Sequence, residues 1–210
     1  SRVSPALLER DPGNRLLARG PRFRADAEVI RDVALSVAGL LHHQLGGPSV
    51  YPPVPQSVLD YNYVKPDYWS VPSGPQRYRR GVYVFRKRSM PDPALTSFDA
   101  PNADAACARR DRSDTPLAGL VSLNEPIFVE AARAMALRVL REAPADDAQR
   151  VRYAFRLCTG RFPAAAEQEA LLSLLADQRK RLAEGWLSIN EGATGDPADR
   201  PDLPPGATPQ

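Results

Sequence analysis

Apolar residues recur every three or four positions in several stretches of the chain, and this spacing predicts amphipathic helices. Asp11-Pro12 opens a short helix that stops at Gly20. A longer helix begins at Asp26, a suitable N-cap, and continues to Gly46-Gly47, where glycine favours a helix end. The positions predicted to share the buried face of this longer helix are Ile30, Val33, Ala34, Val37 and Leu41.

Residues 98–140 lead from a charged loop into two successive helices, and the rest of the chain is organised around them. Thr115-Pro116 is a helix start, because the hydroxyl can accept from a first-turn N–H and proline suits the first helical position. Asn124 is predicted to cap the second helix, which Glu125-Pro126 opens. The positions predicted to be buried in the second helix are Phe128, Ala131, Ala132, Met135 and Val139.

Two more helices are predicted in the last third of the chain. Asp146 and Gln149 resemble a capping box, and the helix that they open ends at Thr159-Gly160. Pro163 restarts the chain into a leucine-rich helix that stops at Gly185. Beyond it, residues 188–210 carry few apolar side chains and are predicted to form a flexible tail.

Residues 48–101 interrupt this helical pattern with a proline-rich irregular insertion, which excludes long helices and central strands. Residues 82–85 alternate like a short strand, and since a lone strand leaves backbone groups unpaired, we expect a small β-hairpin there. Aromatic residues should make the insertion an ordered loop packed on the helices: Tyr51, Tyr61, Tyr63, Tyr68 and Trp69. The predicted fold is therefore mainly α, with about five helices around one core in a single domain over residues 1–187.

Composition and charge narrow the class of protein. The net charge is only +3, and 25 acidic residues balance 28 basic ones, so a nucleic-acid binder with a segregated basic excess is not expected. Three of the basic residues are lysines, which leaves 28 − 3 = 25 arginines, the side chain best suited to pairing with carboxylate, sulfate or phosphate. No apolar run is long enough to span a membrane. Ser1 is not an initiator methionine, so we expect a fragment of a longer protein.

Several motifs in this order resemble a planctomycete-type domain of unknown function, found C-terminal in large exported proteins with an upstream cytochrome-c-like haem module. The matching segments are D-P-G-N-R-L-L (11–17), R-F-R-A-D-A-E-V-I-R-D (22–32), G-G-P-S-V (46–50), R-R-G-V-Y-V-F (79–85), F-D-A-P (98–101), C-A-R-R-D-R-S-D-T-P-L (107–117), L-N-E-P-I-F-V-E-A-A-R (123–133) and A-F-R-L-C-T-G-R-F-P (154–163). The chain departs from that pattern at Ala118-Gly119 and at Glu125, where the family usually has Gln-Ala and Asp.

The resemblance implies an exported protein, periplasmic or at the cell surface, with upstream domains as partners. Haem c would belong to an upstream domain, since this chain has no C-x-x-C-H motif and no cofactor is expected in it. The resemblance implies no established activity.

Arg109 and Arg110 precede the Thr115 helix start, and two roles are open for them. They could clamp an anion together with the helix N-terminal amides. Alternatively, they brace the loop by binding carbonyls and carboxylates such as Asp99. We favour bracing.

Arginine and tyrosine are dense over residues 78–88, and guanidinium and aromatic groups suit a sulfated or uronic-acid glycan. The candidate glycan contacts are Arg79, Arg80, Tyr83, Arg86 and Arg88. A buried strand with solvated arginine flanks is the competing interpretation.

Acidic residues, cysteines and histidines give weaker indications of a functional site. Asp26, Glu28, Asp32 and Asp99 could supply paired carboxylates for acid/base chemistry, but arginine pairing explains them more simply. Cys107 and Cys158 are either a disulfide or two free thiols. His42-His43 lacks a nearby third ligand, so no metal site is predicted.

Taken with the resemblance, these features favour an accessory or interaction module that packs on a haem-bearing neighbour or engages polysaccharide. The alternative is part of a hydrolase or redox enzyme acting on complex glycans, with a site shared with an upstream domain. A cleft in which two carboxylates converge without arginine partners would favour the enzyme, whereas acids paired with arginines would favour the module.

Overall fold

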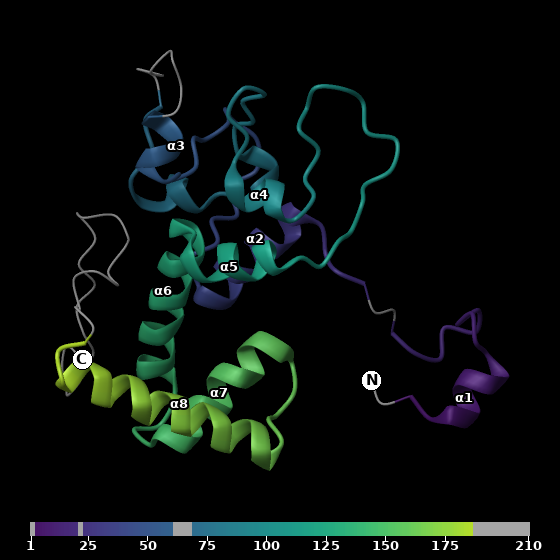
Figure 1. The fold of residues 1–210 in the computed structure, drawn as a ribbon, viewed down its shortest axis with the longest axis vertical. Coiled ribbons are helices and arrows are strands. Elements are labelled where there is room, and N and C mark those ends of the chain that lie inside the picture. The colour runs from purple at the N-terminus through teal and green to yellow at the C-terminus, as the bar shows by residue number, and fades with distance from the viewer. Residues whose placement is uncertain (1–2, 21–22, 61–68, 187–210) are drawn as a thin grey trace.

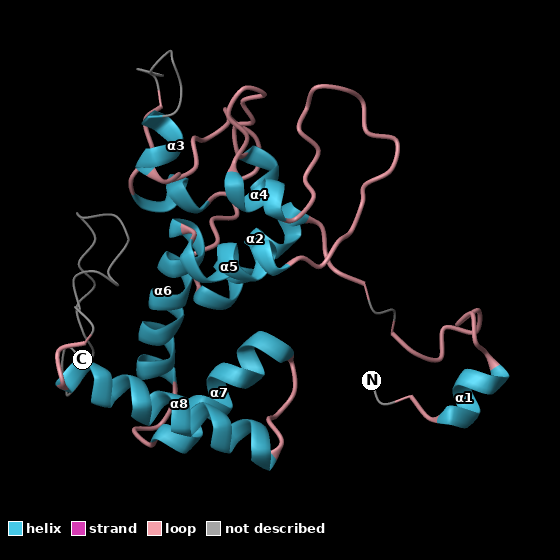
Figure 2. Ribbon diagram, in the orientation of Figure 1, coloured by secondary structure: helices cyan, strands magenta, loops and turns pink. Residues whose placement is uncertain are grey.

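A computed structural model describes residues 3–20, 23–60 and 69–186. The predicted mainly α fold is confirmed, and Figure 2 shows helices joined by long loops over these residues. The α-helices are α1 (Pro5–Arg10), α2 (Ala27–Ala38), α3 (Gln56–Asp60), α4 (Pro93–Ser97), α5 (Pro116–Asn124), α6 (Pro126–Glu142), α7 (Asp147–Thr159) and α8 (Ala165–Ala183). Two short 3-10 helices, η1 (Gly74–Tyr78) and η2 (Gly81–Tyr83), lie between α3 and α4.

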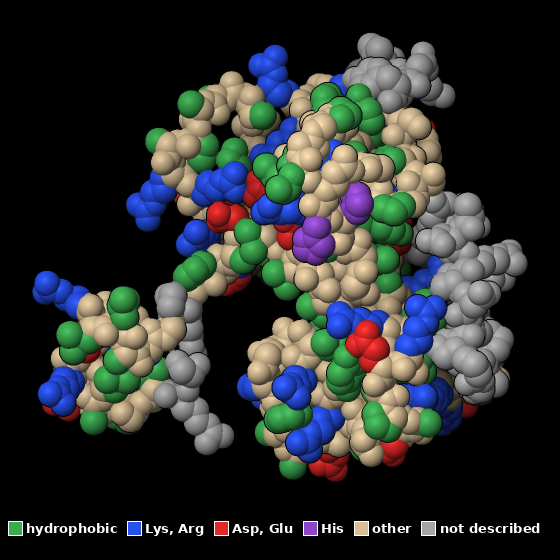
Figure 3. All heavy atoms as spheres, turned by 180° about the vertical axis from the view of Figure 1, so that it is seen from behind, with side chains coloured by type: hydrophobic (Ala, Val, Ile, Leu, Met, Phe, Trp, Pro, Cys, Tyr) green, Lys and Arg blue, Asp and Glu red, His purple; other side chains and the backbone are tan. Residues whose placement is uncertain are grey.

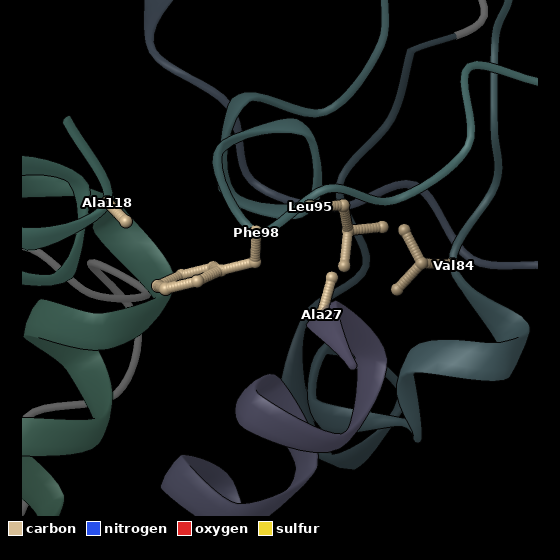
Figure 4. Packing of buried hydrophobic residues seen from close by; sticks show 5 residues of the cluster. All are labelled: Ala27, Val84, Leu95, Phe98 and Ala118. Carbon is tan, nitrogen blue, oxygen red and sulfur yellow. The ribbon is translucent and has the colours of Figure 1, made fainter. Parts of the chain in front are cut away.

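The core lies where α2 packs against α6 and α4. One buried cluster joins α2 to α6 through Leu35, Ala38, Tyr78, Ile127 and Ala131. A second cluster joins the start of α2 to α4 and α5, and Figure 4 shows Leu95, Val84 and Ala27 close together, with the Phe98 ring pointing toward Ala118.

Helix α2 is shorter than predicted and is rotated relative to the prediction. It ends at Ala38 because Gly39, at φ +80°, takes the left-handed conformation and donates its N–H to the carbonyls of Leu35 and Ser36. Its buried residues include Arg31, a charged side chain that an apolar pattern does not identify. The predicted core residue Val33 is exposed.

No β-hairpin forms at residues 82–85, so that prediction is wrong. The chain there is the 3-10 helix η2, followed by a single parallel bridge between Val84 and Val50. Phe85 N–H donates to the Val50 carbonyl at 2.8 Å, and this bond partly satisfies the extended backbone. Gly81 permits close packing on α2, because an added Cβ would lie 2.9 Å from the Glu28 Cα.

The expectation that aromatic residues order the proline-rich insertion is supported by one cluster. The Tyr51 ring lies 5.1 Å from Trp69 and 4.9 Å from Phe85, measured between centroids. Trp69 also donates its indole N–H to the Pro52 carbonyl. Tyr61, Tyr63 and Tyr68, expected to act in the same way, lie outside the described residues.

The N-terminal helix lies before the position predicted for it. Helix α1 covers residues 5–10, and Asp11, predicted to start a helix, instead follows the end of α1. The Asp11 carboxylate accepts from the N–H groups of Arg15 and Leu16, so it closes a turn. Figure 1 shows α1 lying apart from the other helices.

The junction of α5 and α6 agrees with the prediction except for one cap. Thr115 caps α5, and its hydroxyl accepts from the Ala118 N–H at 3.3 Å. Asn124 is the last residue of α5 rather than the cap of α6, and Glu125 occupies the position between the two helices. Ala132, predicted to be buried, is exposed.

Helices α7 and α8 start and stop close to the predicted residues. Asp146 caps α7 by accepting from the Gln149 N–H at 2.9 Å, and Gly160, at φ +70°, follows its last residue. Figure 1 shows α7 and α8 at the end of α6 that lies farthest from α4. No residue of either helix is buried. The predicted tail, residues 188–210, lies outside the described residues.

Candidate functional site: an arginine–carboxylate cluster on α2

The predicted loop residues come together with the acids of α2. The loop that follows Phe98 returns to the first half of α2. It brings arginines that are far from α2 in the sequence into contact with the carboxylates at this end of the helix. Glu28 binds two of them: Arg110 donates from Nη1 at 2.7 Å and from Nη2 at 3.2 Å, and Arg86 forms a further ion pair. Burial raises the pKa of Glu28, but the Arg110 hydrogen bonds and both guanidinium charges outweigh burial and leave that pKa below its usual value.

Asp99 anchors the start of this loop. It has a φ of +58°, a conformation that aspartate tolerates better than most residues. Its carboxylate accepts from the N–H of Ser113 at 2.7 Å and from the Ser113 hydroxyl, and it forms an ion pair with Arg24. The Ser113 hydrogen bonds, supported by the Arg24 charge, lower the pKa of Asp99. Ser113, which the sequence analysis missed, thereby holds the loop two residues before the Thr115 cap.

The predicted bracing role therefore fits Arg110, although its partner is Glu28 rather than the expected aspartates. Arg109 differs, because within the described part of the chain its guanidinium makes no hydrogen bond or ion pair. Both lie beside an open hollow of about 660 Å³ that is lined by Asp26, Arg109, Arg110, Asp111 and Arg112. Arg112 pairs with Asp26 at 3.3 Å, so this arginine is also occupied.

One of the predicted glycan contacts, Arg79, is unavailable to a ligand, and the prediction is corrected for it, whereas Tyr83 is half-buried. Arg79 is 0% exposed and donates to the carbonyls of Gln44, Gly46 and Pro48. Its guanidinium carbon lies 3.8 Å from the centroid of the Tyr83 ring, whose hydroxyl accepts from the Gly46 N–H. Both side chains hold residues 44–48 in place.

The other three predicted glycan contacts lie nearer the surface. Arg80 is paired with Asp32 at 3.4 Å, and Asp32 also accepts from the Gly81 N–H at 2.6 Å. Arg86 is engaged by Glu28 and by the Pro101 carbonyl. Arg88 is exposed. The five residues therefore do not form one common surface.

A buried polar group between α2, η1 and α6 was not predicted. Arg31 donates to the carbonyls of Arg77 and Arg79. Arg77 in turn donates from Nε to Glu130 of α6 at 2.9 Å. Each acceptor lies more than 40 residues from its donor, so no local sequence pattern could have paired them.

Burial dominates the titration of two carboxyls, those of Glu125 and Asp92. Burial, followed by the charge of Asp92, raises the pKa of Glu125 to about 7. Burial also raises the pKa of Asp92, although the N–H groups of Leu95 and Ala94 donate to it. The Oε1 atom of Glu125 has no hydrogen-bond partner among the described residues. Both side chains are closed to solvent, so neither lies in a substrate-accessible cleft.

The two cysteines are free thiols, so the disulfide considered for them is absent from this structure. Cys107 lies in the loop before α5 and donates to the Arg109 carbonyl, while Cys158 of α7 lies beside Met135, with 3.7 Å between sulfurs. Figure 1 shows the loop and α7 at opposite ends of the helical body, which explains why the thiols do not meet.

Neither a metal-binding cluster nor a membrane-spanning helix occurs within the described ranges. No group of three or more His, Cys, Asp or Glu side chains there could hold a metal ion. Over the same residues, every helix is too short or too polar to cross a membrane.

Comparison with known proteins supports the resemblance at the level of the family. A family model described as PSD1, protein of unknown function (DUF1553), matches residues 1–175. Neither the curated proteins nor the solved structures include a match to the chain. Because the matched residues are most of the 210-residue chain and include the whole arginine–carboxylate cluster, the chain belongs to the PSD1 (DUF1553) family of proteins of unknown function.

Proposed function

We propose that the chain is a non-catalytic interaction module of a larger exported protein, and that it docks against a neighbouring domain through α5. The single observation that carries the proposal is an apolar face on that helix. Leu117, Leu120 and Leu123, spaced three residues apart, are 59%, 59% and 76% exposed. Residues at this spacing share one side of a helix, so the three leucines form a patch.

The opposite side of α5 is already used. It buries Ala118 in the core cluster with Phe98, and α5 packs on α4 and α6. The leucine face is therefore the free side of a helix that the core holds in place. Large contiguous apolar patches on a soluble protein mark interaction surfaces, and burying one leucine contributes about 1.5–3 kcal/mol.

The arrangement of acids supports a module rather than an enzyme. Four carboxylates were candidates for acid/base chemistry, and each is occupied by at least one arginine: Asp26, Glu28, Asp32 and Asp99. Glu125 makes no ion pair among the described residues, but it is buried. No observation specifically favours a hydrolase or redox enzyme.

The identity of the neighbour is proposed from the family resemblance. An upstream domain that carries haem c in the same exported protein, periplasmic or at the cell surface, would cover α5. Polysaccharide is the alternative partner, but leucines suit a protein surface better than a hydroxyl-rich sugar polymer.

The test is binding between this chain and the remaining domains of its parent protein. Leu120→Glu should weaken that binding at least tenfold, since 1.4 kcal/mol corresponds to a factor of ten. Leu45→Glu is the matched control, because Leu45 is 76% exposed but lies outside α5. Equal affinities for the wild-type chain and Leu120→Glu would contradict the docking role of α5.

A further inference from the structure

Two arginines of α7 share one aromatic ring. Arg152 and Arg156 lie four residues apart, so they project from the same side of the helix. Their guanidinium carbons lie 4.2 Å and 4.9 Å from the centroid of the Phe162 ring. Gly160, at φ +70°, ends α7 and turns the chain, which allows Phe162 to pack back on the helix.

These guanidinium groups have no acidic partner among the described residues. The neighbouring acids are engaged elsewhere: Glu167 accepts from Arg161 at 2.6 and 2.7 Å, and Asp147 forms an ion pair with Arg179. Arg152 and Arg156 are both exposed, and Phe162 is 50% exposed. Like charges at this spacing repel, and the Phe162 ring, in contact with both guanidinium groups, holds them near each other without neutralising them.

We propose that Arg152 and Arg156 form a binding site for a tetrahedral oxyanion, a sulfate or phosphate group carried by a ligand. Each guanidinium keeps N–H donors free for a ligand, because a cation–π contact uses the face of the group and not its edge. The Phe162 ring fixes both side chains, so binding costs less side-chain entropy than it would for two unrestrained arginines.

The site fits an isolated anionic group better than a nucleic acid. A single-stranded nucleic acid stacks its bases on open aromatic rings, whereas both arginines lie over Phe162. Figure 3 shows Lys and Arg side chains over the α7–α8 end of the molecule with Asp and Glu among them, rather than a continuous basic stripe. Spaced sulfate or phosphate groups on a polymer or small ligand match this pattern.

The test measures binding of the 210-residue chain to inorganic sulfate, inorganic phosphate and dextran sulfate by calorimetry at low salt, with neutral dextran as a blank. Arg152→Gln/Arg156→Gln should weaken dextran sulfate binding about tenfold, because it removes two charge-assisted contacts. Arg10→Gln/Arg181→Gln removes the same charge from exposed positions elsewhere and should change affinity less than about twofold. Phe162→Leu keeps both charges but removes the ring that positions them, so it should also weaken binding.

Several results would overturn the site. One is that the wild-type chain binds none of sulfate, phosphate and dextran sulfate. Another is that the site variant and the control variant lose the same affinity for dextran sulfate. A third is that Phe162→Leu binds as tightly as the wild-type chain. Tighter binding to a single-stranded oligonucleotide than to dextran sulfate would show that the patch recognises a nucleic acid instead. Stronger binding of phosphate than of sulfate would identify a phosphate-bearing ligand and support the site. Neither α5 nor its leucines enters this test, so its outcome is independent of the docking proposal.

Discussion

Glu125→Gln should stabilise the protein above neutral pH. Glu125 lies between α5 and α6, is 5% exposed, and has an Oε1 atom without a partner among the described residues. Burial, with the charge of Asp92, raises its pKa from the usual 4.5 to about 7. The folded protein therefore holds this proton more tightly than the unfolded chain does.

The sign and size of the expected change in the free energy of unfolding follow from this difference between the folded and unfolded pKa. Stability due to the protonated carboxyl is fully present below pH 4.5 and is lost as pH rises through about 7. The interval between these two pKa values corresponds to about 3 kcal/mol of unfolding free energy, since one pKa unit is about 1.4 kcal/mol. A glutamine avoids the charge, but its amide is still poorly partnered, so the net gain at pH 8 should be about 2 kcal/mol. Near pH 4.5 the gain should disappear.

Urea unfolding of the wild-type chain and Glu125→Gln from pH 4.5 to 8.5 measures this difference directly. Glu142→Gln is a control of opposite sign, because hydrogen bonds from Tyr153 and Arg138 lower the pKa of Glu142 and its charge stabilises the fold above that pKa. A stability difference between the wild-type chain and Glu125→Gln that stays constant across the pH range would refute the reasoning.

Three further substitutions test the packing, and one labelling experiment tests the state of the cysteines. Arg79→Leu should lower the free energy of unfolding by about 3–5 kcal/mol, because three carbonyls lose a charged donor and the Tyr83 ring loses its cation; a urea midpoint within error of wild type would contradict this. Arg110→Ala should cost about 1 kcal/mol by urea unfolding, and added sulfate should not restore it, because its role is to pair with Glu28. Gly81→Ala should cost about 1–3 kcal/mol in thermal unfolding, since the new Cβ meets the backbone of α2. Alkylation under denaturing, non-reducing conditions should label both cysteines, and labelling of neither would indicate a disulfide.

Much of the helical framework could be predicted because its signals are local. Thr115 and Asp146 cap their helices as expected, since a short polar side chain before a helix satisfies a first-turn N–H wherever the helix lies. Gly160 ends α7 for an equally local reason, its left-handed backbone. The start of α2 at Asp26 was also predicted, although its end was not.

What could not be predicted depends on contacts between distant segments. Glu28 and Arg110 are 82 residues apart, and any of the 25 acidic residues could have been the partner of that arginine. Arg31 occupies a core position because the carbonyls of Arg77 and Arg79 satisfy its guanidinium. Apolar periodicity therefore identified Ile30 and Ala34, which pack against the core, but missed Arg31. The arginines of residues 79–88 were grouped by proximity in sequence, whereas the extended backbone between η1 and η2 sends Arg79 inward and leaves Arg80 near the surface.

The docking role of α5 is the central claim, and hydrogen exchange tests it most directly. The measurement compares α5 amides in the full-length parent protein with the same amides in the 210-residue chain alone. The account predicts exchange at least tenfold slower in the parent, because a docked partner would suppress local opening of α5. Equal exchange rates in the two proteins, with the leucine face equally open in both, would contradict it.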